Sequence, residues 1–122
     1  MSPAPTERVL IRPLEAPDLA AIAALERQIF PSPWRAADFG GFLRLPAGLG
    51  RVAVRADAVI GYAVGWVASD EAELANVAVA GEARRRGVGR TLLEAFLAAA
   101  AARGARSLWL EVRAGDAGAQ AF

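Results

Sequence analysis

The sequence predicts an α/β fold, a mixed β-sheet with helices on both of its faces. Apolar runs of strand length alternate along the chain with longer stretches in which apolar residues recur every three or four positions, the spacing of an amphipathic helix. One such helical stretch lies between two strand-like runs late in the chain, which is the pattern of two parallel strands joined by a crossover helix. With 122 residues, of which 55% are hydrophobic, the chain is expected to form a single domain, residues 1–122.

The chain is expected to start with one strand and two helices. Val9–Ile11 is a short apolar run of strand type. Over residues 19–29 the apolar positions follow a period of 3.6, and Asp18 stands where an acidic residue can cap the start of a helix. Pro31 ends this helix, because proline cannot continue the hydrogen-bond ladder. A second, shorter helix is predicted over 36–43.

Three strands are predicted in the middle of the chain. Residues 49–54 and 59–68 are separated by a turn at 56–58 and are expected to pair as a β-hairpin. The apolar run Leu74–Val79 is the third strand, and a turn at Asp70-Glu71 leads into it.

The last elements form the crossover unit. A long helix is predicted over 91–103, and Gly104 is well placed to end it. Residues 108–112 read as a fifth strand, which a crossover helix would place parallel to the strand that ends at Val79. Asp116–Phe122 is expected to begin another helix.

A glycine-rich turn with four arginines, residues 84–90, lies between the third strand and the long helix. Gly87 and Gly89 allow close approach of a ligand to the first N–H groups of the helix, which favour an anion such as phosphate. The P-loop pattern needs a lysine, and the chain has none, while the Rossmann pattern needs a glycine where Leu92 stands. From these residues alone, a phosphate site and a merely solvated helix start are both open.

Composition narrows the chemistry that the chain can perform. It has no histidine and no cysteine, which excludes histidine bases, thiol chemistry and the commonest metal ligands, so no metal site is predicted. No run approaches the ~20 apolar residues of a membrane span, and the first residues lack the apolar core of a signal peptide. A cytoplasmic location is therefore expected.

Charge is unevenly placed, although the formal net charge is only +1. Residues 57–82 hold five acids and no arginine, whereas residues 84–113 hold seven arginines and two acids. This asymmetry suits an enzyme that takes an anionic cofactor and a cationic amine, with chance patterning of surface charge as the alternative. The basic residues are local and lack interleaved aromatics, so nucleic-acid binding is not expected.

Several phrases of the sequence resemble a known family. Arg84, Gly87 and Gly89 fill the acetyl-CoA signature [Q/R]-x-x-G-x-[G/A] of the GNAT acetyltransferases. The phrases at 76–79 and 109–114, and Pro33-Trp34 after the first helix, look like those of the RimI-type ribosomal-protein alanine N-terminal acetyltransferases. The resemblance implies a GNAT-like sheet with a splayed parallel strand pair, acetyl-CoA as co-substrate, and a protein N-terminus or small amine as acceptor.

The resemblance also implies which residues hold acetyl-CoA. The pyrophosphate would lie on the backbone N–H groups of 85–90, and the pantetheine amides would pair with the main chain of Val77 and Val79. Asp116 stands where the family has an asparagine, so the amide donor is lost at this contact. The cofactor-binding residues implied are Val77, Ala78, Val79, Arg84, Arg85, Arg86, Gly87, Val88, Gly89, Arg90 and Asp116.

Glu111 is the candidate general base, because it matches the glutamate of the family's Leu-Glu-Val-Arg phrase. The alternative for Glu111 is a structural ion pair with Arg113, two residues further along the same face. Glu73 is a second, weaker candidate for the base, and Tyr62 is expected in the core.

Relative to the family the chain is expected to be C-terminally short, without the tyrosine that protonates the thiolate and without the last strands. An acyl-CoA-binding module with little or no catalysis is therefore the alternative to an active N-acetyltransferase. A third reading is self-association through an open sheet edge.

Overall fold

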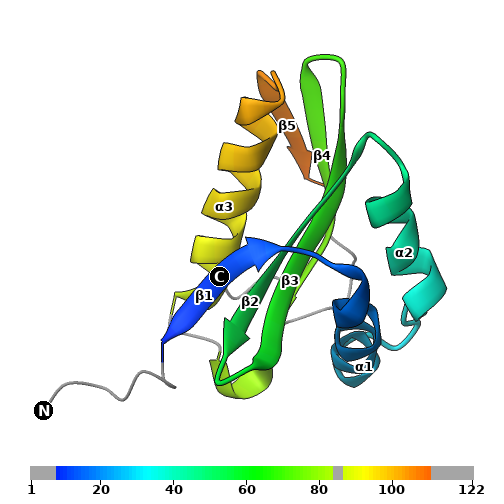
Figure 1. Cartoon of the computed structure of the whole chain (residues 1–122), viewed down its shortest axis with the longest axis vertical. Helices are drawn as coiled ribbons and strands as arrows, with labels where there is room; N and C mark the ends of the chain where they lie inside the picture. The colour runs from blue at the N-terminus through cyan, green and yellow to red at the C-terminus, as the bar shows by residue number, and fades with distance from the viewer. Residues whose placement is uncertain (1–7, 84–86, 111–122) are drawn as a thin grey trace, which may run out of the picture.

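The structure is a computed structural model, which describes residues 8–83 and 87–110. Within these ranges the elements follow the predicted order, with two 3₁₀ turns added (Figure 1). They are β1 (Val9–Pro13), η2 (Ala16–Asp18), α1 (Leu19–Ile29), α2 (Ala36–Arg44), β2 (Gly48–Arg55), β3 (Ala58–Ala68), β4 (Glu71–Val79), η3 (Gly81–Ala83), α3 (Val88–Ala102) and β5 (Ser107–Leu110).

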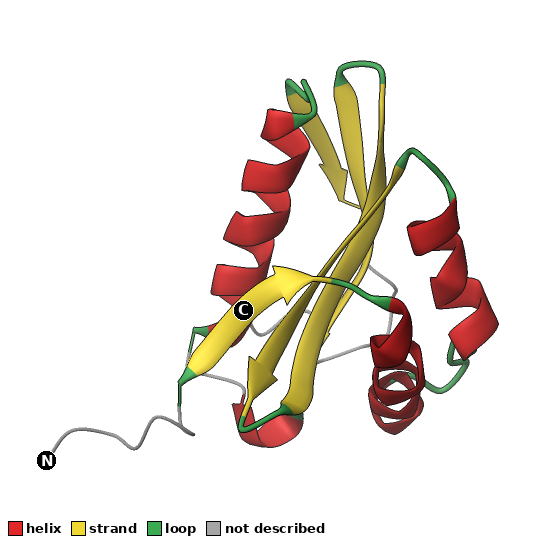
Figure 2. Ribbon diagram, viewed as in Figure 1, coloured by secondary structure: helices red, strands yellow, loops and turns green. Residues whose placement is uncertain are grey.

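The five described strands form one mixed sheet in the order β1-β2-β3-β4-β5. The first four are antiparallel, and β4 and β5 are parallel, as the crossover helix predicts. Helix α3 covers one face of the sheet, and α1 and α2 cover the other (Figure 2). The expected mixed sheet with helices on both faces is therefore confirmed.

Each face of the sheet has its own hydrophobic cluster. On the α3 face, Leu92, Phe96 and Ala100 of the helix pack on side chains from β2, β3 and β4. On the opposite face, Ile22 and Leu25 of α1 join residues of α2, β2, β3 and β4. The sheet is thus buried on both sides, which explains why its central strands read as nearly continuous apolar runs.

Strand β4 contains a β-bulge at Ala75. Val64 of β3 pairs with Asn76, but the next residue, Gly65, pairs with Leu74, so Ala75 is the extra residue. Because side chains alternate along a strand, one extra residue exchanges the faces of everything beyond it. Leu74 and Val77 therefore both belong to the α3 cluster, although they are three residues apart.

Several boundaries differ from those expected. Helix α3 begins at Val88, three residues before Thr91, and β4 begins at Glu71, three residues before Leu74. Strand β1 continues to Pro13, because its pairing with β2 reaches Arg51. The end of the predicted strand 108–112 and the helix expected over 116–122 lie outside the described residues.

The hairpin between β2 and β3 closes through Ala56 and Asp57. Both residues are exposed and have positive φ angles, 51° and 63°. Positive φ at both central positions is the geometry of a two-residue hairpin turn that matches the twist of the strands. The expected turn at 56–58 is confirmed, with Ala58 already in β3.

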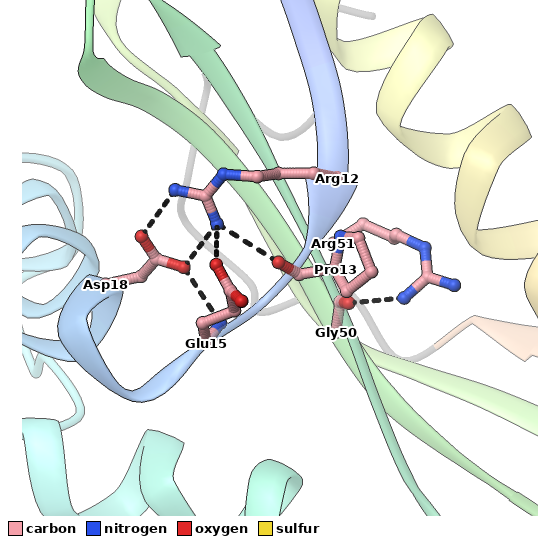
Figure 3. A network of polar contacts seen from close by, with 6 residues as sticks. All are labelled: Arg12, Pro13, Glu15, Asp18, Gly50 and Arg51. Carbon is pink, nitrogen blue, oxygen red and sulfur yellow. Dashed lines mark hydrogen bonds and ion pairs between the residues drawn. The ribbon is translucent and has the colours of Figure 1, made fainter.

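The connection from β1 to α1 is held by an ion pair between Arg12 and Asp18 (Figure 3). The two terminal nitrogens of Arg12 donate to the two carboxylate oxygens of Asp18 at 2.7 and 2.8 Å, and the Glu15 N–H donates to Asp18 at 2.8 Å. The expectation that Asp18 caps α1 with its side chain is therefore wrong, because these stronger partners take up the carboxylate.

The ion pair changes the acidity of both groups. The hydrogen bond from Arg12 holds the pKa of the buried Asp18 carboxyl below its ordinary value, although burial opposes this change. The same bond raises the pKa of Arg12.

Helix α3 is fastened to the sheet at its C-terminal end. Arg103 donates to the carbonyl oxygen of Gly48 at 2.8 Å and to that of Pro46 at 3.4 Å. Nearby, Arg51 donates to the carbonyl of Gly50 at 2.8 Å. Burial lowers the pKa of Arg51, and the charge of Arg103 acts in the same direction.

The Arg12–Asp18 pair predicts a pH-dependent stability. Because folding lowers the pKa of Asp18, its contribution is complete above about pH 4–5 and is lost as the pH falls through the folded-state value. Asp18→Asn should lower the free energy of unfolding at pH 7 by about 1.5–3 kcal/mol, measured by urea denaturation. The difference from the wild type should shrink at pH 3.

The exposed Asp57→Asn variant is the control, and it should unfold like the wild type at both pH values. A constant difference between Asp18→Asn and the wild type across this pH range would contradict the assignment.

Gly65 of β3 lies where the register shifts at the bulge, and the close packing there predicts that this position tolerates no side chain. A Cβ at Gly65 would lie 1.9 Å from the carbonyl oxygen of Glu73 and 2.8 Å from the ring of Phe96. Gly65→Ala should lower the free energy of unfolding by about 3 kcal/mol, because neither neighbour can yield cheaply. Gly41→Ala in α2, where a Cβ would meet nothing within 4 Å, should be neutral or stabilising in the same urea titration. Equal stability of the two variants would refute the strict need for glycine.

Candidate active site

Helix α3 begins with a left-handed glycine. Gly87 has φ 80° and ψ 7°, which a residue with a side chain adopts only at a cost. The N–H and the hydroxyl of Thr91 both point to the Gly87 carbonyl, at 3.0 and 2.8 Å. The N–H groups of Val88, Gly89 and Arg90 thus precede the first rung of the helical ladder, as expected of an anion-binding helix start.

Among the described residues, the surroundings of Gly87 are open. Gly87 is exposed, and a Cβ there would meet no atom of these residues within 4 Å. Val88 and Gly89 are buried behind it, and Val88 lies in one cluster with Val79 at the end of β4. The first turn of α3 is therefore held against the end of β4 while Gly87 faces outward.

Arg90 is the one arginine of the predicted anion site that lies within the described residues. Its side chain is 84% exposed and pairs with Glu94, one helical turn on, at 3.7 Å. An exposed pair of this kind adds little energy, and the acid offsets part of the positive charge. Arg84, Arg85 and Arg86 lie outside the described residues.

Beyond the bulge, the backbone N–H and C=O groups of successive β4 residues point alternately toward β3 and away from it. The Ala80 N–H donates to the Ile60 carbonyl at 2.7 Å, and in antiparallel strands hydrogen-bonded and non-hydrogen-bonded pairs alternate. Ala78 is therefore in a hydrogen-bonded pair with β3, whereas Val77 and Val79 are not. The backbone groups of Val77 and Val79 face the other side of β4, where β5 lies.

The described part of β5 pairs only with the first half of β4. Its partners are Glu71 to Leu74, in register with Ser107 to Leu110. Over Ala75–Val79, the neighbouring strand that the structure describes is β3.

Glu73 lies at the other end of β4, in a row across three strands. Its register partners are Trp66 of β3 and Trp109 of β5, and the three side chains line a shallow pocket of about 170 Å³. Trp66 and Trp109 are 38% and 61% exposed. Glu73 therefore lies on the paired half of β4, away from Val77, Val79 and the start of α3.

A buried polar cluster, absent from the sequence prediction, joins α1 to the sheet. The Glu26 carboxyl accepts hydrogen bonds from the Tyr62 hydroxyl, from the Asn76 amide at 2.8 Å and from the Trp34 N–H at 2.9 Å. Glu26 and Tyr62 are fully buried, so the core position expected for Tyr62 is confirmed. In the sequence, Glu26 is a charged residue on the apolar face of a predicted helix, and this position was the signal that could have indicated a buried polar cluster.

Besides Arg84, Arg85 and Arg86, two further expected site residues lie outside the described part of the chain. Glu111 and Asp116 belong to residues 111–122, and so does Arg113, the alternative partner of Glu111. The sequence expectations for them stay predictions.

Neither a membrane-spanning helix nor a metal centre is found in the described part of the chain. None of its helices is long and apolar enough to cross a bilayer, and its acidic side chains form no group that could hold a metal ion.

The relatives found by sequence similarity are named for the same enzymatic activity. The ribosomal protein bS18-alanine N-acetyltransferase of Salmonella typhimurium is 36% identical over 114 residues, which cover 89% of this chain and 73% of the relative. The Escherichia coli K12 protein of the same name is 35% identical over 117 residues, 92% of this chain and 75% of that protein. The chain is thus shorter than these relatives, as expected.

Solved structures show the same fold. The crystal structure of the Escherichia coli ribosomal-protein-S18-alanine N-acetyltransferase superposes with a TM-score of 0.81 at 34% identity, over 93% of this chain and 73% of that one. The aminoglycoside N-acetyltransferase AAC(6')-Iy in complex with CoA superposes with a TM-score of 0.77 at 20% identity, over 88% of this chain and 78% of that one.

Most of the chain matches one protein family. Residues 19–122 match the family described as the acetyltransferase (GNAT) family, a range that includes α1, β4 and the glycine turn before α3. The fold, the turn and the family match agree, and the chain belongs to the GNAT acetyltransferases.

Proposed function

We propose that this chain transfers the acetyl group of acetyl-CoA to the α-amino group of a protein N-terminus that begins with alanine. The names of relatives at 36% and 35% identity support alanine and ribosomal protein bS18 as acceptor, and a ribosomal acceptor implies the cytoplasm as the place of action. The observation that carries the proposal is the left-handed Gly87, which opens α3, a helix whose first residue Val88 lies in one cluster with Val79 at the end of β4.

The start of α3 fits a pyrophosphate. The N–H groups of Val88, Gly89 and Arg90 and the helix dipole attract an anion, and the absence of a side chain at Gly87 leaves room for it. Arg84, Arg85 and Arg86 would add positive charge, as the sequence predicts.

Strand β4 fits the pantetheine arm. The backbone groups of Val77 and Val79 face away from β3, toward the side of β4 along which a strand-like ligand would lie. The side chains of both valines are buried against α3, and Ala78 faces α1, so the contact would use main chain rather than side chains. Asp116 is proposed as a further contact.

The reaction itself needs two proton transfers. The amine loses a proton and its nitrogen forms a bond to the acetyl carbon, the bond from that carbon to sulfur breaks, and the thiolate gains a proton. Glu111 is proposed to accept the proton of the amine. Tyr62 is excluded as the acid for the thiolate, since it is fully buried and its hydroxyl donates to Glu26.

The cofactor assignment predicts a specific effect of Gly87→Val. Valine resists the left-handed conformation, which costs residues other than glycine about 1–2 kcal/mol, and it would also crowd the pyrophosphate. Acetyl-CoA affinity measured by calorimetry should fall at least about tenfold. Gly81→Val is the matched control, because a Cβ at Gly81 also meets no described atom within 4 Å and its φ is not positive. Unchanged affinity in Gly87→Val would refute the assignment.

The proposed base predicts how Glu111→Gln changes turnover. The rate of acetyl transfer to an alanine-starting peptide should fall by about 10²–10⁴-fold, with acetyl-CoA affinity preserved. The loss should shrink at high pH, where the amine is already deprotonated. Glu71→Gln, an exposed glutamate of β4, should leave the rate unchanged. Binding of acetyl-CoA without transfer by the wild type would instead identify a binding module.

A further inference from the structure

Glu26 is a fully buried acid that the proposed reaction does not use. It lies on α1, with 0% of its surface exposed. Burying a carboxyl group is costly unless its oxygens are hydrogen-bonded, so its partners indicate what the group is for.

The two oxygens of Glu26 serve two different parts of the molecule. Oε1 accepts from the Tyr62 hydroxyl of β3 and from the Asn76 amide of β4, and therefore faces the sheet. Oε2 accepts from the Trp34 N–H in the connection between α1 and α2. One carboxyl group thus spans from the sheet to this connection, residues 30–35, here called the α1–α2 loop.

The sheet side of this contact adjoins the proposed cofactor strand. Asn76 directly precedes Val77 and follows the bulge residue Ala75. The next residue that faces α1, Ala78, packs in the same cluster as Phe30 at the start of the loop. Glu26 therefore joins the loop to the segment of β4 proposed to carry the pantetheine arm.

The loop is exposed between its two fixed ends. Phe30 is buried, and the ring of Trp34 packs on Phe39 and Phe42 of α2 with centroid distances of 5.4 and 5.8 Å. Pro31, Ser32 and Pro33 between them are exposed. The prolines restrict the backbone further, so the loop presents a surface of fixed shape.

This placement suits the loop to meet the acceptor. The proposed pyrophosphate lies at α3, on one face of the sheet, and an arm that follows the side of β4 would leave the acetyl group accessible from the other face. That face carries α1, α2 and the loop (Figure 1).

We propose that Glu26 is a positioning residue, which fixes the α1–α2 loop against β4 so that the loop orients the N-terminus of the acceptor toward the acetyl group. This inference rests on the proposed function. Glu26 touches neither reactant, and its effect passes through Trp34 on one side and Asn76 on the other.

The Glu26→Gln variant can keep the hydrogen bonds to the sheet while it loses the one to the α1–α2 loop. Glutamine has one accepting oxygen and one donating NH₂ group. The orientation that still satisfies Tyr62 and Asn76 turns the NH₂ toward the Trp34 N–H, so two donors face each other and the loop is released. Glu26→Asp is the second variant, because it keeps the carboxylate but is one methylene too short to reach both sides.

Tyr62→Phe is the matched control. It removes one buried hydrogen bond to Oε1 and leaves the bond from Trp34 to Oε2 in place. A loss of stability alone would therefore affect Tyr62→Phe and Glu26→Gln alike, whereas release of the loop would affect only the glutamate variants.

Three measurements on the full chain test the proposal. Hydrogen exchange of the Trp34 amide, followed by NMR, should accelerate about tenfold or more in Glu26→Gln, because its hydrogen bond is lost. The KM for an alanine-starting peptide should rise about tenfold, while acetyl-CoA affinity should stay within about twofold of the wild type. Glu26→Asp should show the same pattern, and Tyr62→Phe should retain wild-type values for all three.

Opposite results would overturn the proposal. Unchanged Trp34 exchange in both glutamate variants would refute the contact, and an equal loss of acetyl-CoA and peptide binding would reduce Glu26 to a general structural role. If the wild type binds acetyl-CoA but transfers nothing to the peptide, the proposed function fails and the acceptor role with it. Trp34 exchange would then still decide whether Glu26 holds the loop.

Discussion

The register of β4 is the constraint on which the rest of the molecule depends. This strand packs against α3 on one face and α1 on the other, and its two halves have different neighbours. Without the extra residue at Ala75, the side chains beyond it would exchange faces, and Asn76 would point toward α3 instead of Glu26. One bulge thus sets both the hydrophobic packing and the side to which the backbone of Val77 and Val79 is directed.

Much of the architecture could be predicted because its signals are local. Helical periodicity marks α1 and α3, paired apolar runs mark the hairpin, and the single crossover helix between the last two strands favours a parallel pair. Gly87 was identifiable for a physical reason, since its backbone conformation strongly favours glycine. The pair of Arg90 with Glu94 could also have been found, because residues four apart on a helix are neighbours.

Features that depend on distant partners could not be predicted in this way. Asp18 has the sequence position of a helix cap, yet its carboxylate binds Arg12 on the preceding strand. Glu26 finds Tyr62 and Asn76 only once the sheet is assembled, 36 and 50 residues along the chain. The bulge at Ala75 is likewise a property of strand pairing, which no local pattern specifies.

The tip of the β2–β3 hairpin is a site where the fold is expected to tolerate changes in sequence and length. Ala56 and Asp57 hold left-handed backbone angles, which aspartate tolerates and alanine does not favour, so the pairing of β2 with β3 helps to hold Ala56 in the turn. Both side chains are exposed, and neither belongs to a hydrophobic cluster. The tip is therefore a natural point at which evolution or an engineer can lengthen the chain, graft a peptide or attach a probe while both faces of the sheet keep their packing.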